Sequence, residues 1–114
     1  MPEFMLLMRG SQDSFNNMTD TEQMEIIKQH VAWSKQLDGK GILTGGDGCS
    51  SQTIMLKPEG SEIRQVSRPF GNSENEVSGF YIITADDIQS AIDIAKQCPA
   101  LRQGESVEVI PLGH

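Results

Sequence analysis

The sequence predicts a single α+β domain in which two helices pack against a small sheet. Its 114 residues match the usual size of one domain. Segments of strand length alternate with two segments of helical periodicity, as in other domains of this class. The hydrophobic fraction of 37% and the charged fraction of 22% are typical of an ordered protein. We therefore expect one domain over residues 1–114.

The first helix is expected to begin after Thr19. Glu22 follows that residue by three positions, which is the spacing of a capping box. The helix is expected to end near Gly39, because glycine readily adopts the left-handed conformation that closes a helix. Between these limits the apolar residues have helical spacing and fall into two stripes. One stripe comprises Met24, Ile27 and Val31, and the other comprises Ile26, His30, Trp33 and Leu37.

Several other segments have the length and composition of strands. Residues 3–8 form a short apolar run, and the polar stretch at 11–20 after it indicates a loop. Residues 53–57 and 62–66 are expected to form a hairpin, because the residues between them favour a turn. Residues 79–85 (GFYIITA) are rich in β-branched and aromatic side chains. Their continuous apolarity predicts a central strand that is covered on both faces.

A second helix and a last strand complete the chain. Asp86 is expected to cap the helix, with Gln89 completing the capping box, and Cys98 with the following proline to end it. Residues 106–110 alternate between valine and polar residues, which predicts a half-buried strand. The stripe that the second helix is expected to bury comprises Ile88, Ala91, Ile92 and Ala95.

This order of elements, β-α-β, a hairpin and then β-α-β, predicts a ferredoxin-like, split β-α-β arrangement. Two helices can cover only one face of such a small sheet. The other face is then expected to be covered by a partner, most simply an identical chain. The sequence therefore predicts a homodimer.

A glycine-rich segment, Gly45-Gly46-Asp47-Gly48, follows a short strand expected at 42–44. It lacks the Lys-Ser/Thr pair of a phosphate-binding loop, and no helix follows whose N-terminus could hold an anion. We interpret it as a tight turn. The sequence also has no Ser-His-Asp order, no cluster of metal ligands and no dinucleotide fingerprint. We expect neither a metal ion nor another cofactor.

The formal net charge of −7 argues against nucleic-acid binding, because an acidic surface repels phosphate groups. The first ten residues resemble no signal peptide, and no apolar stretch is long enough for a membrane-spanning helix. We therefore expect a cytoplasmic location without membrane association. In that compartment Cys49 and Cys98 are both expected to be free, buried thiols.

Three segments together resemble the YCII-related (DGPF) family: EFMLLMRG at 3–10, RPFGNSENEVSGFYIITADDIQSAIDIAKQCP at 68–99, and GESVEVIPLGH at 104–114. The resemblance covers nearly the whole chain. It implies a ferredoxin-like α+β domain that pairs into a dimeric α/β barrel. Members are mostly uncharacterised; some are associated with extracytoplasmic-function sigma factors, and an enzymatic role has been suggested for others from a His-Asp pair in a cleft.

The chain departs from the family in its signature tetrapeptide, Asp-Gly-Pro-Phe. Ser67, Arg68, Pro69 and Phe70 stand in its place, so only the last two residues match. A serine hydroxyl can donate a hydrogen bond but cannot serve as a carboxylate base. Any chemistry that depends on the signature aspartate is therefore in doubt here.

The residues that could form a site are expected at the mouth of the barrel. His30 is the candidate catalytic residue, as a general acid or base, and the alternative is a half-buried polar residue at a helix edge. Arg9 and Arg68 could bind a carboxylate or phosphate, and the alternative for each is a surface ion pair. Trp33 and Phe70 could line an apolar ligand pocket, with core packing as the alternative.

These observations favour a homodimeric domain that binds a small molecule, with no reaction indicated. One alternative is a small enzyme that uses His30 for proton transfer on a small polar substrate. Another, which the resemblance suggests, is a regulatory protein-interaction module linked to extracytoplasmic-function sigma factors. The sequence leaves open whether the protein is an enzyme.

Overall fold

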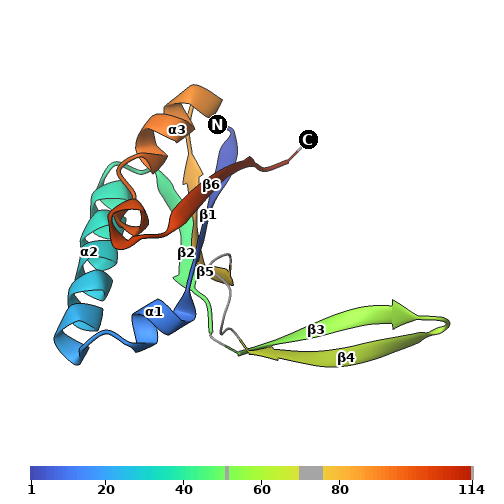
Figure 1. Cartoon of the computed structure of the whole chain (residues 1–114). Coiled ribbons are helices and arrows are strands. Elements are labelled where there is room, and N and C mark those ends of the chain that lie inside the picture. The colour runs from blue at the N-terminus through green and yellow to red at the C-terminus, as the bar shows by residue number, and fades with distance from the viewer. Residues whose placement is uncertain (51, 70–75, 114) are drawn as a thin grey trace.

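The computed structural model of the chain describes residues 1–50, 52–69 and 76–113. The elements are, in chain order, β1 (Glu3–Gly10), α1 (Gln12–Asn16), α2 (Asp20–Gly39), β2 (Leu43–Gly48), β3 (Gln52–Glu59), β4 (Glu62–Pro69), β5 (Glu76–Thr84), α3 (Ile88–Ala95), the 3-10 helix η1 (Pro99–Gln103) and β6 (Ser106–Pro111) (Figure 1).

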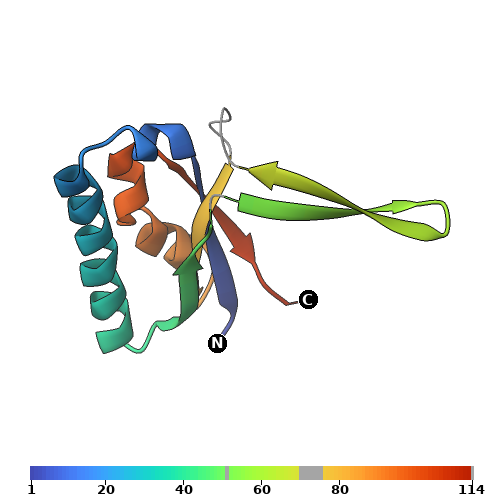
Figure 2. The same cartoon turned by 90° about the horizontal axis from the view of Figure 1, so that it is seen from below.

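The main sheet has the strand order β2-β5-β1-β6, and each pair of neighbours is antiparallel. β1 and β2 therefore run parallel with β5 between them, which is the split β-α-β arrangement that the sequence predicts. Figures 1 and 2 show α2 and α3 on one face of this sheet, which leaves the opposite face open. The α+β, ferredoxin-like prediction is confirmed.

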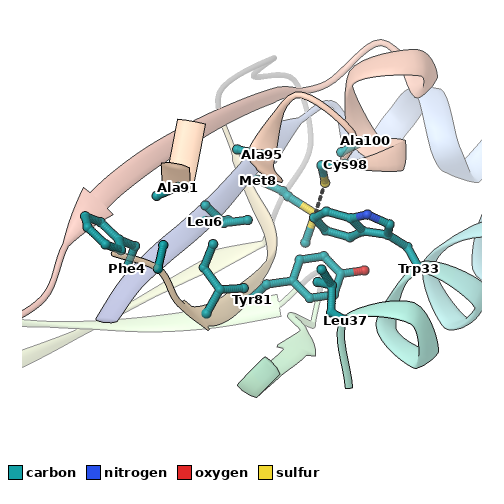
Figure 3. Packing of buried hydrophobic residues seen from close by; sticks show 12 residues of the cluster. Phe4, Leu6, Met8, Trp33, Leu37, Tyr81, Ala91, Ala95, Cys98 and Ala100 are labelled. Carbon is teal, nitrogen blue, oxygen red and sulfur yellow. Dashed lines mark hydrogen bonds between the residues drawn. The ribbon is translucent and has the colours of Figure 1, made fainter. Parts of the chain in front are cut away.

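The hydrophobic core lies between the sheet and the two long helices. Alternate residues of β1 and β5 point into it, because successive side chains of a strand point to opposite faces. The core side chains are Phe4, Leu6 and Met8 from β1, Tyr81 and Ile83 from β5, Trp33 and Leu37 from α2, and Ala85, Ala91, Ala95, Cys98 and Ala100 from the C-terminal part (Figure 3).

Helix α2 begins as predicted. The Glu22 amide donates to the Thr19 hydroxyl oxygen at 3.1 Å, and the Thr19 amide donates to the Glu22 carboxylate at 3.0 Å. Of the two predicted stripes, the one with Trp33 and Leu37 faces the core. The other stripe stays largely exposed, at 58% for Met24, 53% for Ile27 and 47% for Val31.

Three local predictions were wrong. The stretch after β1 contains the short helix α1, whose N-cap residue Ser11 accepts a hydrogen bond from the Ser14 amide at 3.2 Å. The cap of α3 is Asp87 rather than Asp86, because it is the Asp87 carboxylate that accepts from the Ser90 amide, at 2.8 Å. Ile88, predicted to be buried, is 44% exposed.

The glycine-rich segment is not a turn but part of β2, paired with β5. Gly46 shows why glycine is needed there. Its φ angle is 149°, and a Cβ atom on it would lie 2.7 Å from the carbonyl oxygen of Phe80. β2 can approach β5 this closely only because Gly46 has no side chain.

The predicted hairpin is confirmed, and it is an arm that projects from the body. β3 and β4 pair only with each other, and Gly60 closes the turn with a φ angle of 63°. The arm extends on the side of the sheet away from the helices (Figures 1 and 2). The radius of gyration is 15.9 Å, whereas a compact domain of this length has about 13 Å.

Candidate functional site

A cavity of about 980 Å³ lies between α1, α2 and the main sheet. Its lining includes the end of β1, the first half of β5 and the loop that leads into β6. Its size is typical of small-molecule sites, which usually have mostly apolar walls and a few polar groups. The apolar wall residues include Met8, Phe15, Met18, Ile26, Val31 and Leu43.

Three polar side chains from different elements meet at the wall of this cavity. His30 Nδ1 lies 2.6 Å from the hydroxyl oxygen of Tyr81, and His30 Nε2 lies 3.0 Å from Oε1 of Gln103. The Gln103 amide nitrogen in turn donates to Oε1 of Gln29 at 3.0 Å. Helix α2, strand β5 and helix η1 thus hold both nitrogens of the imidazole ring.

This chain of hydrogen bonds assigns the protons of His30. Because the amide nitrogen of Gln103 faces Gln29, its oxygen faces the imidazole and accepts a proton from Nε2. In the neutral ring Nδ1 is then the acceptor, and the Tyr81 hydroxyl donates to it. With the Gln103 amide in this orientation, the contacts hold the ring in one orientation and favour the Nε2–H tautomer of the neutral imidazole.

The Tyr81 phenol is held in its neutral form. Burial raises its pKa to about 12, a hydrogen bond with Ser34 works in the opposite direction, and the nearby Cys98 adds to the rise. The ring packs against the core as well, since the edge of one ring meets the face of the other in the Trp33–Tyr81 pair, with centroids 4.9 Å apart. Figure 3 shows the two rings side by side. Tyr81 is thus a rigid hydrogen-bond donor at the wall of the cavity.

The charged residues of the lining balance one another. They are the cations Arg9 and Lys35 and the anions Asp47 and Glu105. Glu105 accepts a hydrogen bond from the Ser78 hydroxyl at 3.1 Å. The cavity therefore has no excess of either charge to attract a strongly charged ligand.

The structure brings two of the predicted site residues to the cavity. His30 and Arg9 both line it, and Arg9 Nε also lies 3.6 Å from a carboxylate oxygen of Glu108 on β6. Trp33 is 6% exposed and belongs to the core. It packs against the Tyr81 ring and does not itself line the cavity. The backbone of Arg68 lies in β4 of the arm, opposite Thr53, and Phe70 lies outside the described residues.

Sequence reasoning missed Tyr81 and Gln103, the two partners of His30. Tyr81 stands in β5, whose central position was correctly predicted, but the prediction that both of its faces are covered was wrong for the single chain, because only alternate residues are buried. The alternation of Tyr81 with Gly79 and Ile83 could have assigned it to the helix face. Gln103 lies in a 3-10 helix that carries no strong sequence signal. The cavity itself could not be predicted, because it depends on how α1 and α2 are set against the sheet.

Residues 1–50, 52–69 and 76–113 contain neither a candidate metal site nor a candidate membrane-spanning helix. In that part of the chain, His, Cys, Asp and Glu side chains nowhere gather in threes as they would around a metal ion. Nor do those residues include a helix with the length and apolar character needed to cross a membrane.

The comparisons with known proteins agree with the fold. No curated protein matches the chain. The model of the YCII-related domain matches residues 3–112, from the first residue of β1 to just beyond β6. The chain therefore belongs to the YCII-related family.

Proposed function

We propose that this chain is a homodimeric domain that binds a small uncharged or zwitterionic molecule in the cavity beside His30. The observation that carries the proposal is the hydrogen-bonded set of Tyr81, His30 and Gln103 at the wall of a mostly apolar cavity. A part-buried polar set of this kind can orient the polar group of a ligand, while the apolar walls contact the rest of it.

The equal numbers of cations and anions in the cavity lining argue against a strongly charged ligand. Arg9 and Lys35 share the lining with Asp47 and Glu105, so a phosphate-rich ligand would gain little and would meet two carboxylates. A molecule with a hydroxyl, carbonyl or amide group on an apolar frame fits better. Tyr81 can accept a hydrogen bond from such a group while it donates to His30.

The open face of the main sheet supports the homodimer. Met5, Ile82 and Ile110 are paired across β5, β1 and β6, and paired residues point to the same side of the sheet. Since their neighbours Leu6 and Ile83 are in the core, these three face away from the helices and are half-buried in the single chain. A second copy stacked on this face would cover an apolar surface by two-fold symmetry.

A thermal-shift screen against a library of small metabolites tests the ligand site. A ligand at a hundred times its Kd adds about 2.7 kcal/mol to stability, which raises the Tm of a domain this size by roughly 10 °C. Hits should also change the fluorescence of Trp33, the single tryptophan, because it packs on Tyr81.

Two variants separate binding in the cavity from binding elsewhere. Tyr81→Phe keeps the ring but removes the hydroxyl, and should reduce or abolish the shift. Lys28→Ala changes an exposed residue of α2, the helix of His30, that lies outside the lining, and should leave the Tm shift intact. A library without hits, or hits that bind Tyr81→Phe unchanged, would count against the proposal.

A second function, proton transfer, is favoured by the 2.6 Å contact between Tyr81 and His30. A substrate O–H or N–H could give its proton to the Tyr81 oxygen while the phenol passes its own proton to His30 Nδ1. The phenol then stays neutral, and the positive charge appears on the imidazole. If a hit is turned over, Tyr81→Phe should lower kcat by about a hundredfold or more, whereas a pure binding protein would show no turnover to lose.

A further inference from the structure

The arm formed by β3 and β4 carries an exposed apolar face. Ile54 is 67% exposed, Leu56 61% and Ile63 66%. Ile54 and Leu56 are two positions apart on β3, and Pro58, two positions further, is paired with Ile63 on β4. Because alternate residues and paired residues share a face, these side chains lie on one side of the arm.

The opposite side of the arm has a different character. Near the tip it carries Lys57 paired with Arg64 and Glu59 paired with Glu62, and Arg64 Nη1 lies 3.7 Å from a carboxylate oxygen of Glu59. Toward the base this side also carries the apolar pair Met55–Val66, and the first side carries Gln65 and Ser67. Near the tip, one side of the hairpin is therefore charged and the other apolar. A two-stranded hairpin alone is marginally stable in water, so an apolar side on an extended arm indicates a surface that is covered in the assembled protein.

The direction of the arm indicates what covers it. In Figures 1 and 2 the helices lie on one side of the main sheet and the arm extends on the other side, where the open apolar face is. A second copy stacked on the open face would thus lie beside the arm. Its own arm would return along the first copy, because a two-fold axis makes the contact reciprocal.

The length of the arm fits this arrangement. β3 has eight residues, which at about 3.3 Å per residue span roughly 26 Å. Stacked sheets lie about 10 Å apart, so the arm is long enough to pass the partner's sheet and reach its helix layer. The contact would bring the arm's apolar side against the partner, with the charged side left in water.

We propose that the β3–β4 arm is a dimer clasp, whose apolar face of Ile54, Leu56 and Ile63 packs against the second copy of this chain. The inference rests on the homodimer of the proposed function. It adds a second contact, outside the sheet face, that each copy makes to the other.

Sedimentation equilibrium of the full chain tests the clasp. Leu56→Glu places a charge on the apolar face and should raise the dimer Kd by tenfold or more. The matched control, Thr53→Glu, adds the same charge on the opposite face of the same strand and should change the Kd by less than threefold. Leu7→Glu places a charge on the open face of the main sheet and tests the dimer itself.

The outcomes distinguish the two ideas. A wild-type dimer that Leu7→Glu dissociates and Leu56→Glu leaves unchanged would overturn the clasp and retain the dimer. A wild-type monomer at all concentrations would overturn both. The fluorescence of Trp33, far from the arm in the core, reports whether each variant is folded.

Photo-crosslinking tests the clasp without relying on a change in the dimer Kd. A photo-crosslinking amino acid at position 56 should join an isotopically heavy copy to a light one when the two are mixed. Crosslinks found only within one copy would contradict the clasp. Crosslinks between copies would identify the surface on which the arm lies.

Discussion

The hydroxyl oxygen of Tyr81 lies 2.6 Å from Nδ1 of His30, although the two residues are 51 positions apart in the chain. The contact joins the middle of β5 to the inner face of α2. Gln103 holds the other ring nitrogen, so the imidazole is fixed on both sides. The candidate site is therefore part of the packing between helix and sheet, and its geometry can be tested by stability as well as by binding.

The first prediction concerns the stability of the protein at alkaline pH. Burial raises the pKa of Tyr81 from 10.0 to about 12, so the folded chain holds this proton more tightly than the unfolded chain. The resulting stabilisation is complete below pH 10 and is lost as the pH rises through about 12. A pKa shift of this size corresponds to a loss of about 2–3 kcal/mol in the free energy of unfolding.

Urea unfolding of the wild type and Tyr81→Phe across that pH range measures this loss. The free energy of unfolding should fall more steeply for the wild type, since the lysines and other groups are common to both. Because Tyr81 is the single tyrosine, tyrosinate absorbance follows its titration directly. An ordinary tyrosine titration in the folded protein would contradict the burial argument.

The second prediction concerns the tautomer of His30. Long-range proton–nitrogen NMR spectra should show the Nε2–H form, and only His30 and His114 contribute histidine signals. Gln103→Leu removes the acceptor of the Nε2 proton and should reduce the preference for that form. It should also cost about 1–3 kcal/mol of stability, because a part-buried donor loses its partner.

Gln97→Leu is the control for Gln103→Leu. Gln97 is exposed at the end of α3, so the same substitution should leave the spectrum of His30 and the stability within about 0.5 kcal/mol of the wild type. Equal effects of the two variants would show that Gln103 does not position the ring.

The third prediction concerns the close approach of β2 and β5. Gly46→Ala should destabilise the protein by about 1–3 kcal/mol, because a Cβ atom would meet the Phe80 carbonyl oxygen and the φ angle disfavours a side chain. Gly39→Ala is the matched control. A Cβ atom there meets nothing within 4 Å, and alanine at a helix position should be neutral or stabilising by up to about 1 kcal/mol. Chemical denaturation measures both, and a neutral Gly46→Ala would refute the steric argument.

The fourth prediction distinguishes the two thiols. Cys49, which the sequence predicted to be buried, is exposed and lines the cavity. Cys98 is buried as predicted, and its thiol donates to the Met8 sulfur at 3.9 Å. Burial also raises the pKa of Cys98, which lowers its thiolate fraction. A thiol reagent should therefore modify Cys49 in the folded protein and Cys98 only on unfolding.

The same reaction reports on the cavity. A ligand bound beside His30 should slow the modification of Cys49, and Cys49→Ser should abolish the fast phase. If a ligand raises the Tm but leaves the rate at Cys49 unchanged, it binds away from this part of the lining.

The sequence determined the elements whose signals are local. The capping box of Thr19 and Glu22, the end of α2 and the β3–β4 hairpin all follow from a few neighbouring residues. α2 ends at Gly39 as predicted, but the glycine that adopts the left-handed conformation is Gly41. The order of elements then restricted the topology to a split β-α-β sheet. The resemblance to the YCII-related family gave the same fold.

Only the tertiary structure decided which surfaces meet. Both stripes of α2 have helical spacing, but Trp33 is in the core while Ile27 remains exposed. The sequence around Gly46 indicates a turn, and only the close approach of β5 in the structure explains the glycine. Likewise, nothing near His30 in the chain indicates Tyr81 as its partner. Local patterns fix the backbone through short-range hydrogen bonds, whereas the site depends on side chains that packing brings together from distant segments.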